Sequence, residues 1–237
     1  MSSLRRMFDV KRMASLICMR SAIDVCTGTS IPASKLVLRS ESMSTISRFP
    51  VPERSSLPED LQQVMNEVEE KANFVPNVFK ALAHRPEELR AFLHCYDVVM
   101  TNESGLTKAE KELIIVATSG ANNCTYCVVA HGALHRIFSK QPLIADQVAT
   151  NWECADISQR EKAILKFAMK MGRAEPVQES DFEELEKNGL SRDDAWDIGS
   201  VAALFALSNR MAHLMNCRPN DEFYVMGREK REKKEEK

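Results

Sequence analysis

The sequence has little of what membrane proteins, nucleic-acid-binding proteins and β-sheet proteins need. No apolar run approaches the roughly 20 residues of a membrane span. The 32 Lys and Arg residues nearly balance the 34 Asp and Glu residues, and so small a net charge does not favour nucleic acid as a partner. The chain has only eight glycines and no alternating β-branched runs, so strand signals are absent. These absences favour a helical protein with neither a membrane nor a nucleic acid as its partner.

Cysteine is present, but not in the pattern of a secreted protein. Seven cysteines are spread over 237 residues, and only Cys124 and Cys127 are closely spaced. A secreted disulfide scaffold is shorter and denser in cysteine, so the pattern indicates a reducing compartment. The close pair is therefore the part of the cysteine pattern that calls for a chemical explanation.

The two ends of the chain differ in composition from the middle. Residues 1–48 contain eight Lys and Arg, three Asp and Glu, and ten serines. An Arg- and Ser-rich, acid-poor leader is typical of a mitochondrial transit peptide, so the sequence predicts a mitochondrial protein. The alternative is a disordered extension upstream of a second start at Met43, in a cytoplasmic protein. Residues 227–237, almost all charged and of mixed sign, are interpreted as a solvated tail.

From Pro58 onward the pattern is helical. Capping-box sequences begin several of the expected helices, and Gly189 has the position of a helix stop. The boxes are Thr107–Glu110, Ser158–Glu161, Ser180–Glu183 and, as a weaker variant, Ser191–Asp194. The expected helices are 59–72, 76–83, 87–102, 108–121, 124–139, 142–150, 159–172, 180–187 and 192–215. No Pro/Gly linker divides residues 58–226, so 49–226 is predicted to be one all-α domain, with Trp152 and Trp196 as core or interface anchors.

The close cysteine pair opens one of these helices. Cys124 is expected at or near the N-terminus of helix 124–139, where free amides and the helix dipole favour a thiolate. Asn122 or Asn123 could cap that start. Cys127 and His131 are i,i+4 neighbours and share a face with Cys124. The spacing thus brings two thiols and an imidazole together.

A carboxylate on the preceding helix completes the pattern. A turn between helices 108–121 and 124–139 could bring Glu112 back toward His131. We expect Glu112 to orient His131, and His131 to take a proton from Cys127, because the thiolate is the nucleophile. Peroxide would oxidise that thiolate to sulfenic acid, and Cys124 would condense with it to a disulfide. A dithiol reductant would reset the pair by exchange.

These residues resemble a known signature. The pattern Glu112-x11-Cys124-x2-Cys127-x3-His131 is similar to that of the alkyl hydroperoxidase D-like proteins of the carboxymuconolactone decarboxylase superfamily, and to their peroxidase-related branch in particular. The similarity runs from about Pro76 to Arg228 and includes the segments 105–113 and Asn209–Arg210. Alkyl hydroperoxidase D itself carries a histidine where this chain has Tyr126.

The resemblance implies a fold, a reaction and an assembly. The fold would be an all-helical bundle that forms a homo-trimer or homo-hexamer, and the reaction would be reduction of hydroperoxides without a metal or flavin cofactor. Cys127 would match the cysteine that attacks the peroxide, Cys124 the resolving cysteine, and Glu112 and His131 the proton relay. Tyrosine, with a pKa of about 10, cannot serve as a comparable base at position 126.

Three other interpretations compete with this one. A zinc site could use Cys124, Cys127, His131 and a fourth ligand such as His135 or Cys154, although structural zinc sites usually draw on two separated pairs. The thiols could instead sense redox state, or only pack, in a non-catalytic assembly protein. A decarboxylase or lactone-transforming role, known in the wider superfamily, would leave the CxxC pair without a function.

Overall fold

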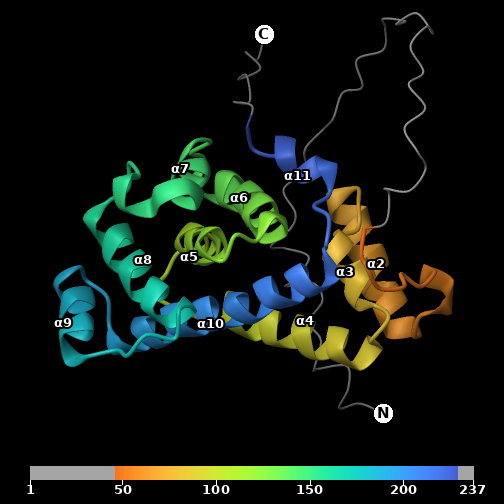
Figure 1. Ribbon diagram of the computed structural model, residues 1–237, viewed down its shortest axis with the longest axis horizontal. Coiled ribbons are helices and arrows are strands. Elements are labelled where there is room, and N and C mark those ends of the chain that lie inside the picture. Colours follow the sequence, from red (N-terminus) through yellow and green to blue (C-terminus); the bar gives the residue numbers. More distant parts are fainter. Residues whose placement is uncertain (1–45, 229–237) are drawn as a thin grey trace, which may run out of the picture.

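The computed structural model describes residues 46–228, and within them every regular element is a helix. Figure 1 shows the helices packed as one bundle. Their bounds are η2 Arg54–Ser56, α2 Glu59–Ala72, α3 Asn77–Leu82, α4 Pro86–Thr101, α5 Lys108–Ala121, α6 Thr125–Ser139, α7 Ile144–Asn151, η3 Trp152–Cys154, α8 Gln159–Gly172, α9 Glu179–Lys187, α10 Arg192–Met215 and α11 Asp221–Val225. The predicted all-α class is confirmed. Within this range no helix has the length and apolarity needed to cross a membrane.

Most of the leader and the tail lie outside the described residues, so their predicted character is not tested. Residues 46–48, the end of the predicted leader, belong to the packed structure. The Arg48 amide donates to the Met215 carbonyl (2.7 Å), and the Arg218 amide donates to the Ile46 carbonyl (3.1 Å). Ser47 is buried. The packed domain therefore begins at least three residues earlier than the predicted boundary at residue 49.

Local capping signals place most helix starts. Thr107, Ser158 and Ser191 each accept a hydrogen bond from the amide three residues later, and the acidic residue there closes the capping box. The box predicted at Ser180–Glu183 is wrong. Helix α9 begins one residue earlier, at Glu179, and the Gln178 amide donates to Asp181 Oδ2 (2.8 Å).

The shifted start of α9 has a tertiary cause. Both carboxylate oxygens of Asp181 accept from Lys170 Nζ on α8 at 2.7 Å. This ion pair holds Asp181 at the third position of the helix. A contact between helices, which local sequence does not reveal, thus decides between two neighbouring capping patterns.

Helix α5 is the centre of the bundle. It contacts α6, α7, α8 and α10, which surround it in Figure 1. Every residue from Glu110 to Ser119 is buried. Fully burying side chains such as Ile114, Ile115 and Val116 contributes about 1.5–3 kcal/mol each. This core fixes the position of Glu112, in the middle of the buried stretch.

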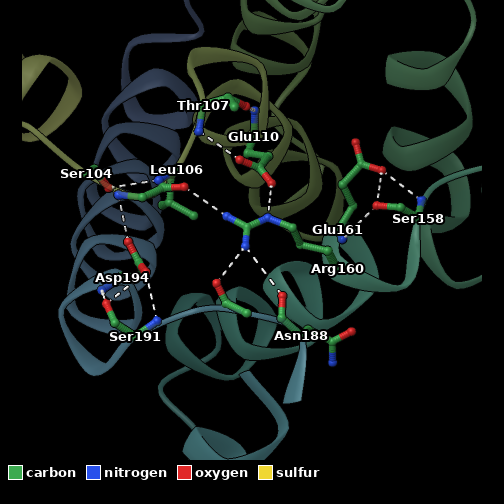
Figure 2. Close-up of polar contacts among 12 residues, drawn as sticks. Ser104, Leu106, Thr107, Glu110, Ser158, Arg160, Glu161, Asn188, Ser191 and Asp194 are labelled. Atoms are coloured by element: carbon green, nitrogen blue, oxygen red, sulfur yellow. Dashed lines mark hydrogen bonds and ion pairs between the residues drawn. The ribbon is translucent and has the colours of Figure 1, made fainter. Parts of the chain in front are cut away.

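The side chain of Arg160 on α8 connects the start of α5 to the loop before α5 and to the loop between α9 and α10 (Figure 2). Arg160 on α8 donates to Glu110 Oε1 (2.8 Å), to the Gly105 carbonyl (2.9 Å) and to the Gly189 carbonyl (3.0 Å). Asp194 on α10 accepts from the Gly105 amide (2.8 Å). Gly189 has φ +73°, the left-handed conformation expected of the helix stop. One side chain thereby joins three segments.

The C-terminal helix α11 is attached to α6 and was not predicted. The buried Arg136 side chain donates to the Phe223 carbonyl (2.8 Å) and to the Met226 carbonyl (2.9 Å). Phe223 packs edge-on against Phe74 at 5.0 Å between ring centroids. A helix of five residues has little stability alone, so these tertiary contacts define it.

Candidate functional site

The turn between α5 and α6 presents the cysteine pair. Asn122 ends α5, and Asn123 has φ +53°, a left-handed conformation that asparagine tolerates well. The Cys124 amide donates to the Ser119 carbonyl (2.9 Å), and Cys124 itself is the N-cap residue of α6. The prediction that Cys124 lies at the helix N-terminus is confirmed. The prediction that Asn122 or Asn123 caps the helix is wrong, because both residues belong to the turn.

Cys127 lies in the first turn of α6, and both thiols are free and 2% exposed. His131 follows one turn later, and its Nδ1 is 2.7 Å from Glu112 Oε2. Glu112 is fully buried, and His131 is 9% exposed. The four residues predicted from the sequence are therefore brought together.

The second oxygen of the carboxylate, Glu112 Oε1, has no hydrogen-bond partner among the described residues. A buried carboxylate is costly unless it is paired, so the hydrogen bond to His131 carries most of its compensation. This bond also fixes the orientation of the imidazole ring, because its other nitrogen, Nε2, must then point away from Glu112.

Cys127 and His131 line an apolar cavity of about 60 Å³. Aromatic and aliphatic side chains from five helices (α3, α4, α6, α10 and α11) and the segment before α3 form most of its wall. The lining residues are Pro76, Val78, Phe79, Phe92, Leu93, Tyr96, Tyr126, Cys127, Ala130, His131, Leu134, Phe205, Ser208 and Phe223. Cys124 is not among them. The two thiols thus differ in what they face: only Cys127 meets the cavity.

Aromatic rings enclose the imidazole. Phe205 meets His131 edge-on at 4.6 Å between ring centroids, and Tyr96 lies at 6.4 Å. Burial and the nearby Glu112 carboxylate raise the pKa of Tyr96 well above its usual value. Burial likewise raises the pKa of Tyr126, whose hydroxyl accepts from the Val78 amide (3.2 Å). Tyr126 is a neutral wall residue and not a base.

The two thiols share a proton unequally. A hydrogen bond from the Cys127 thiol lowers the pKa of Cys124 to about 6 against the opposing effect of burial, with help from the Cys127 backbone amide and from His213. The hydrogen bond to Cys124, together with burial, raises the pKa of Cys127 well above its usual value. Cys124, at the helix N-terminus where the amides favour negative charge, is therefore the better of the two positions for a thiolate.

Helix α10 supplies residues that the sequence did not assign to the site. Ser208 Oγ is 3.9 Å from Cys127 Sγ. The fully buried Asn209 donates to Ser119 Oγ (2.9 Å) and accepts from Asn122 Nδ2 (2.9 Å). A hydrogen bond from its side chain also lowers the pKa of each thiol of the pair. Asn209 belonged to a segment that carried the family resemblance, but nothing in the sequence showed that α10 crosses the cysteine turn.

Other candidate ligands lie away from the pair. His135 is buried, with Nδ1 3.5 Å from Ser139 Oγ. Cys154 is exposed and accepts from Asn151. Within residues 46–228, no three His, Cys, Asp or Glu side chains gather as a metal site would require. The fourth ligands considered for zinc, His135 and Cys154, are thus not assembled with the CxxC pair.

Fold and site together define an all-helical protein with a buried CxxC pair, a histidine–glutamate pair and an apolar cavity. The sequence model of the carboxymuconolactone decarboxylase family matches residues 86–170. An alkylhydroperoxidase AhpD core protein from Ralstonia eutropha JMP134, described as peroxidase-related, is 55% identical over 78% of this chain and 98% of its own, with a TM-score of 0.77. The chain therefore belongs to the alkyl hydroperoxidase D-like, peroxidase-related proteins of the carboxymuconolactone decarboxylase superfamily.

Two further structures show how far the fold extends. A peroxidase-related protein from Silicibacter sp. TM1040 is 36% identical over 78% of this chain and 97% of its own, with a TM-score of 0.74. The debrominase Bmp8 is only 20% identical over 78% of this chain and 97% of its own, with a TM-score of 0.63, and it supports the fold alone. Among curated proteins, none matches the chain.

Proposed function

We propose that this protein is a thiol-dependent hydroperoxide reductase that uses Cys127 and Cys124 as its redox pair. One observation carries the proposal. Cys127 faces an apolar cavity beside His131, and the Nδ1 of that histidine is 2.7 Å from the buried carboxylate of Glu112. A nucleophile, a base and a group that orients the base are the parts that nucleophilic catalysis needs. Membership of a peroxidase-related family supports the same chemistry.

The first half of the reaction takes place at Cys127. His131 accepts the Cys127 proton, and the thiolate attacks the terminal oxygen of the hydroperoxide. An S–O bond forms, the O–O bond breaks, and the alkoxide takes the proton back from His131 and leaves as the alcohol. Cys127 is now a sulfenic acid. Glu112 stabilises the imidazolium while His131 holds the proton.

The second half involves Cys124. As a thiolate, Cys124 attacks Sγ of the Cys127 sulfenic acid, so that the S–S bond forms and the S–O bond breaks. The hydroxide that leaves takes a proton from solvent and becomes water. A dithiol then reduces the disulfide by exchange and is itself oxidised. The lowered pKa of Cys124, about 6, suits this role because the resolving thiol is ionised at neutral pH.

The cavity favours one class of hydroperoxide. Its wall is almost entirely aromatic and aliphatic, so we propose an organic hydroperoxide with an apolar carbon group. Burial of that group would contribute about 25 cal/mol per Å² of apolar surface, which hydrogen peroxide cannot gain. None of the steps above requires a metal or a flavin.

The decisive experiment is a stoichiometric titration. Protein purified without oxygen, with its metal content measured, would be titrated with cumene hydroperoxide and with hydrogen peroxide, and its thiols counted. We expect loss of two thiols per chain, a disulfide between Cys124 and Cys127 in peptide mass spectra, and turnover when dithiothreitol is added. One bound zinc per chain would favour the structural site instead. Oxidation without turnover would favour a redox sensor.

Two variants separate the roles of the sulfurs. Cys127→Ser should abolish hydroperoxide turnover, because it removes the thiol that faces the cavity. Cys124→Ser should permit one oxidation and then stall as a sulfenic acid, which dimedone would trap. Unchanged turnover in Cys127→Ser would refute the assignment, and a stalled sulfenic acid on Cys124 in that variant would reverse the two roles.

We also propose that residues 1–48 direct the protein to mitochondria, on their composition alone. A fluorescent protein carrying residues 1–48 should enter mitochondria, and a fusion in which the first 20 residues have Arg and Lys replaced by Gln should not. Cytoplasmic fluorescence from the unmodified fusion would support the shorter protein that starts at Met43.

A further inference from the structure

A second polar arm reaches the cysteine pair from α10, and none of its residues lines the cavity. His213 is exposed, and its Nε2 is 2.8 Å from the Asn122 carbonyl, to which it donates. Asn122 in turn donates from Nδ2 to Asn209 Oδ1 (2.9 Å). His213 and Asn209 are four residues apart and share a face of α10. The arm thus joins exposed His213 to the fully buried Asn209.

The arm ends at Cys124. Asn209 donates to Ser119 Oγ (2.9 Å), and the Ser119 carbonyl accepts the Cys124 amide (2.9 Å). His213 itself hydrogen-bonds to the turn two residues before Cys124, so its charge acts on that sulfur. The relay of Glu112 and His131 belongs instead to the cavity, which Cys127 and His131 both line. Each sulfur of the pair therefore has its own histidine.

We infer that His213 is a positioning residue for Cys124: it holds the turn that presents this cysteine, and its cationic form stabilises the Cys124 thiolate when the disulfide is broken and when it is formed. The inference rests on the proposed function for its place in the cycle. The titratable groups that face Cys124 are Cys127 on α6, His213 on α10, and Cys217 after α10. Burial, with a smaller effect from the charge of Cys124, raises the pKa of Cys217 to about 12.

The role belongs to two steps of the cycle. During reduction, the thiolate of the dithiol attacks Cys127 Sγ, a new S–S bond forms, the bond to Cys124 breaks, and Cys124 leaves as a thiolate. A better-stabilised leaving thiolate leaves faster. During oxidation, an ionised Cys124 is ready to attack the sulfenic acid at Cys127. Attack of Cys127 on the hydroperoxide precedes both steps and does not involve His213.

The first test does not depend on peroxide chemistry. In a Cys127→Ser background, alkylation of Cys124 by iodoacetamide would be followed by peptide mass spectrometry from pH 4 to pH 10. Adding His213→Gln, which keeps a donor to Asn122 but removes the charge, should raise the midpoint of the alkylation profile by about half a pH unit or more. His213→Lys should bring the midpoint back toward that of the background protein.

Arg210→Gln is the matched control. Arg210 is an exposed cation of the same helix, three residues from His213, and its guanidinium donates to the Ala206 carbonyl. The control should leave the midpoint unchanged. An unchanged midpoint in His213→Gln, or an equal shift in Arg210→Gln, would overturn the role of His213, whether or not the protein reduces peroxides.

The second test places His213 in the cycle. With Cys127 restored, His213→Gln should slow steady-state turnover several-fold and increase dimedone labelling of Cys127, while the rate of the first oxidation stays within about twofold. A slower first oxidation would instead make His213 part of the peroxide-attacking machinery and contradict the inference. Absence of turnover in the unsubstituted protein would refute the proposed function, and the alkylation profile would still decide the role of His213.

Discussion

At the scale of single residues, the site depends on how differently its two sulfurs are surrounded. Cys127 meets the apolar cavity, Ser208 and the turn that carries His131. Cys124 meets the amides of the helix N-terminus and the polar chain from α10. Identical side chains three positions apart thus have opposite pKa shifts. When Cys124 carries the thiolate, Cys127 keeps its proton. A base beside Cys127 must then remove that proton before Cys127 can act as a nucleophile.

We predict that His131→Ala slows the first oxidation of Cys127 by about 100- to 10 000-fold, the usual contribution of a general base. The Cys127 pKa is already raised by Cys124 and burial, so without the imidazole the pH profile of Cys127 alkylation should move further toward alkaline pH. Stopped-flow oxidation and alkylation profiles measure the two effects. His84→Ala, outside the site, should change neither, and an unmoved profile in His131→Ala would contradict the relay.

A buried histidine outside the site gives a pH prediction. Burial lowers the pKa of His135 to about 4 from 6.5, so the folded protein holds this imidazole neutral where the unfolded chain binds a proton. The contribution of His135 to the free energy of unfolding is therefore fully present above pH 6.5. It declines as the pH falls from 6.5 to about 4, by about 3 kcal/mol at 1.4 kcal/mol per pH unit.

Urea unfolding of the wild type and His135→Gln at several pH values measures this effect. The difference between their free energies of unfolding should change by about 3 kcal/mol between pH 7.5 and pH 4, since glutamine does not titrate. Other acidic groups contribute equally to both proteins and cancel. A difference that does not vary with pH would show that the pKa of His135 is the same in the folded and unfolded states.

Spacing along the chain decides which of these residues the sequence could reveal. Glu112 and His131 are 19 positions apart on adjacent helices, so periodicity and one short turn place them together. Ser208 is 81 positions from Cys127, and Asn209 is 90 from Ser119. Only the crossing of α10 over the turn brings them near, and that crossing depends on packing of the whole bundle.

At the scale of elements, capping chemistry explains what was predictable. The starts of α5, α8 and α10 follow from Ser or Thr with an acidic residue three positions later. The start of α9 differs from the predicted one because Lys170 holds Asp181. Helix α11 was not predicted, and it is held in place by Arg136, which donates to the Phe223 carbonyl. Contacts between elements override local signals at these two places.

The crossing of α5 and α7 gives a prediction at this scale. A Cβ at Gly120 would lie 2.5 Å from the Ala149 carbonyl oxygen, a backbone atom that cannot turn away. We predict that Gly120→Ala destabilises the protein by about 1–3 kcal/mol through overpacking, although alanine favours a helix by about 1 kcal/mol. Because Gly120 lies at the end of α5, the substitution should also displace the turn that presents Cys124.

Gly132→Ala is the matched control within α6. The nearest atoms to its added Cβ, Arg136 Nη1 and Ala145 Cβ, lie at 3.4 and 3.6 Å, which is ordinary contact. Helix propensity should then dominate, and stability should rise by up to about 1 kcal/mol. Urea unfolding of both variants checks the pair, and equal effects would show that the α5–α7 contact is not tight.

At the scale of the whole molecule, one face exposes several large apolar side chains. Helix α10 is buried on one side, but Trp196, Ala203, Leu207 and Leu214 are exposed at spacings of seven, four and seven along the other side. Trp196 is 77% exposed, and Val98 is exposed on the neighbouring α4. Figure 1 shows α4 and α10 running along one edge, opposite α7. A row of exposed apolar side chains of this kind is typical of an interaction site.

We predict that a second copy of the chain covers this face, as the expected homo-trimer or homo-hexamer requires. Trp196→Glu combined with Leu207→Asp should shift the protein to a smaller species in light scattering after gel filtration, because burying two unpaired carboxylates costs far more than the apolar contact contributes. The control is Leu143→Asp, at the exposed N-cap residue of α7, a helix that Figure 1 shows on the opposite edge; this variant should leave the mass unchanged. If the double variant keeps the wild-type mass, or if the wild type is a monomer at micromolar concentration, the α10 face does not join copies of the chain.

Since Phe205 and Ser208 of α10 line the cavity on its inner side, a variant that dissociates should also bind hydroperoxide more weakly, with a raised KM.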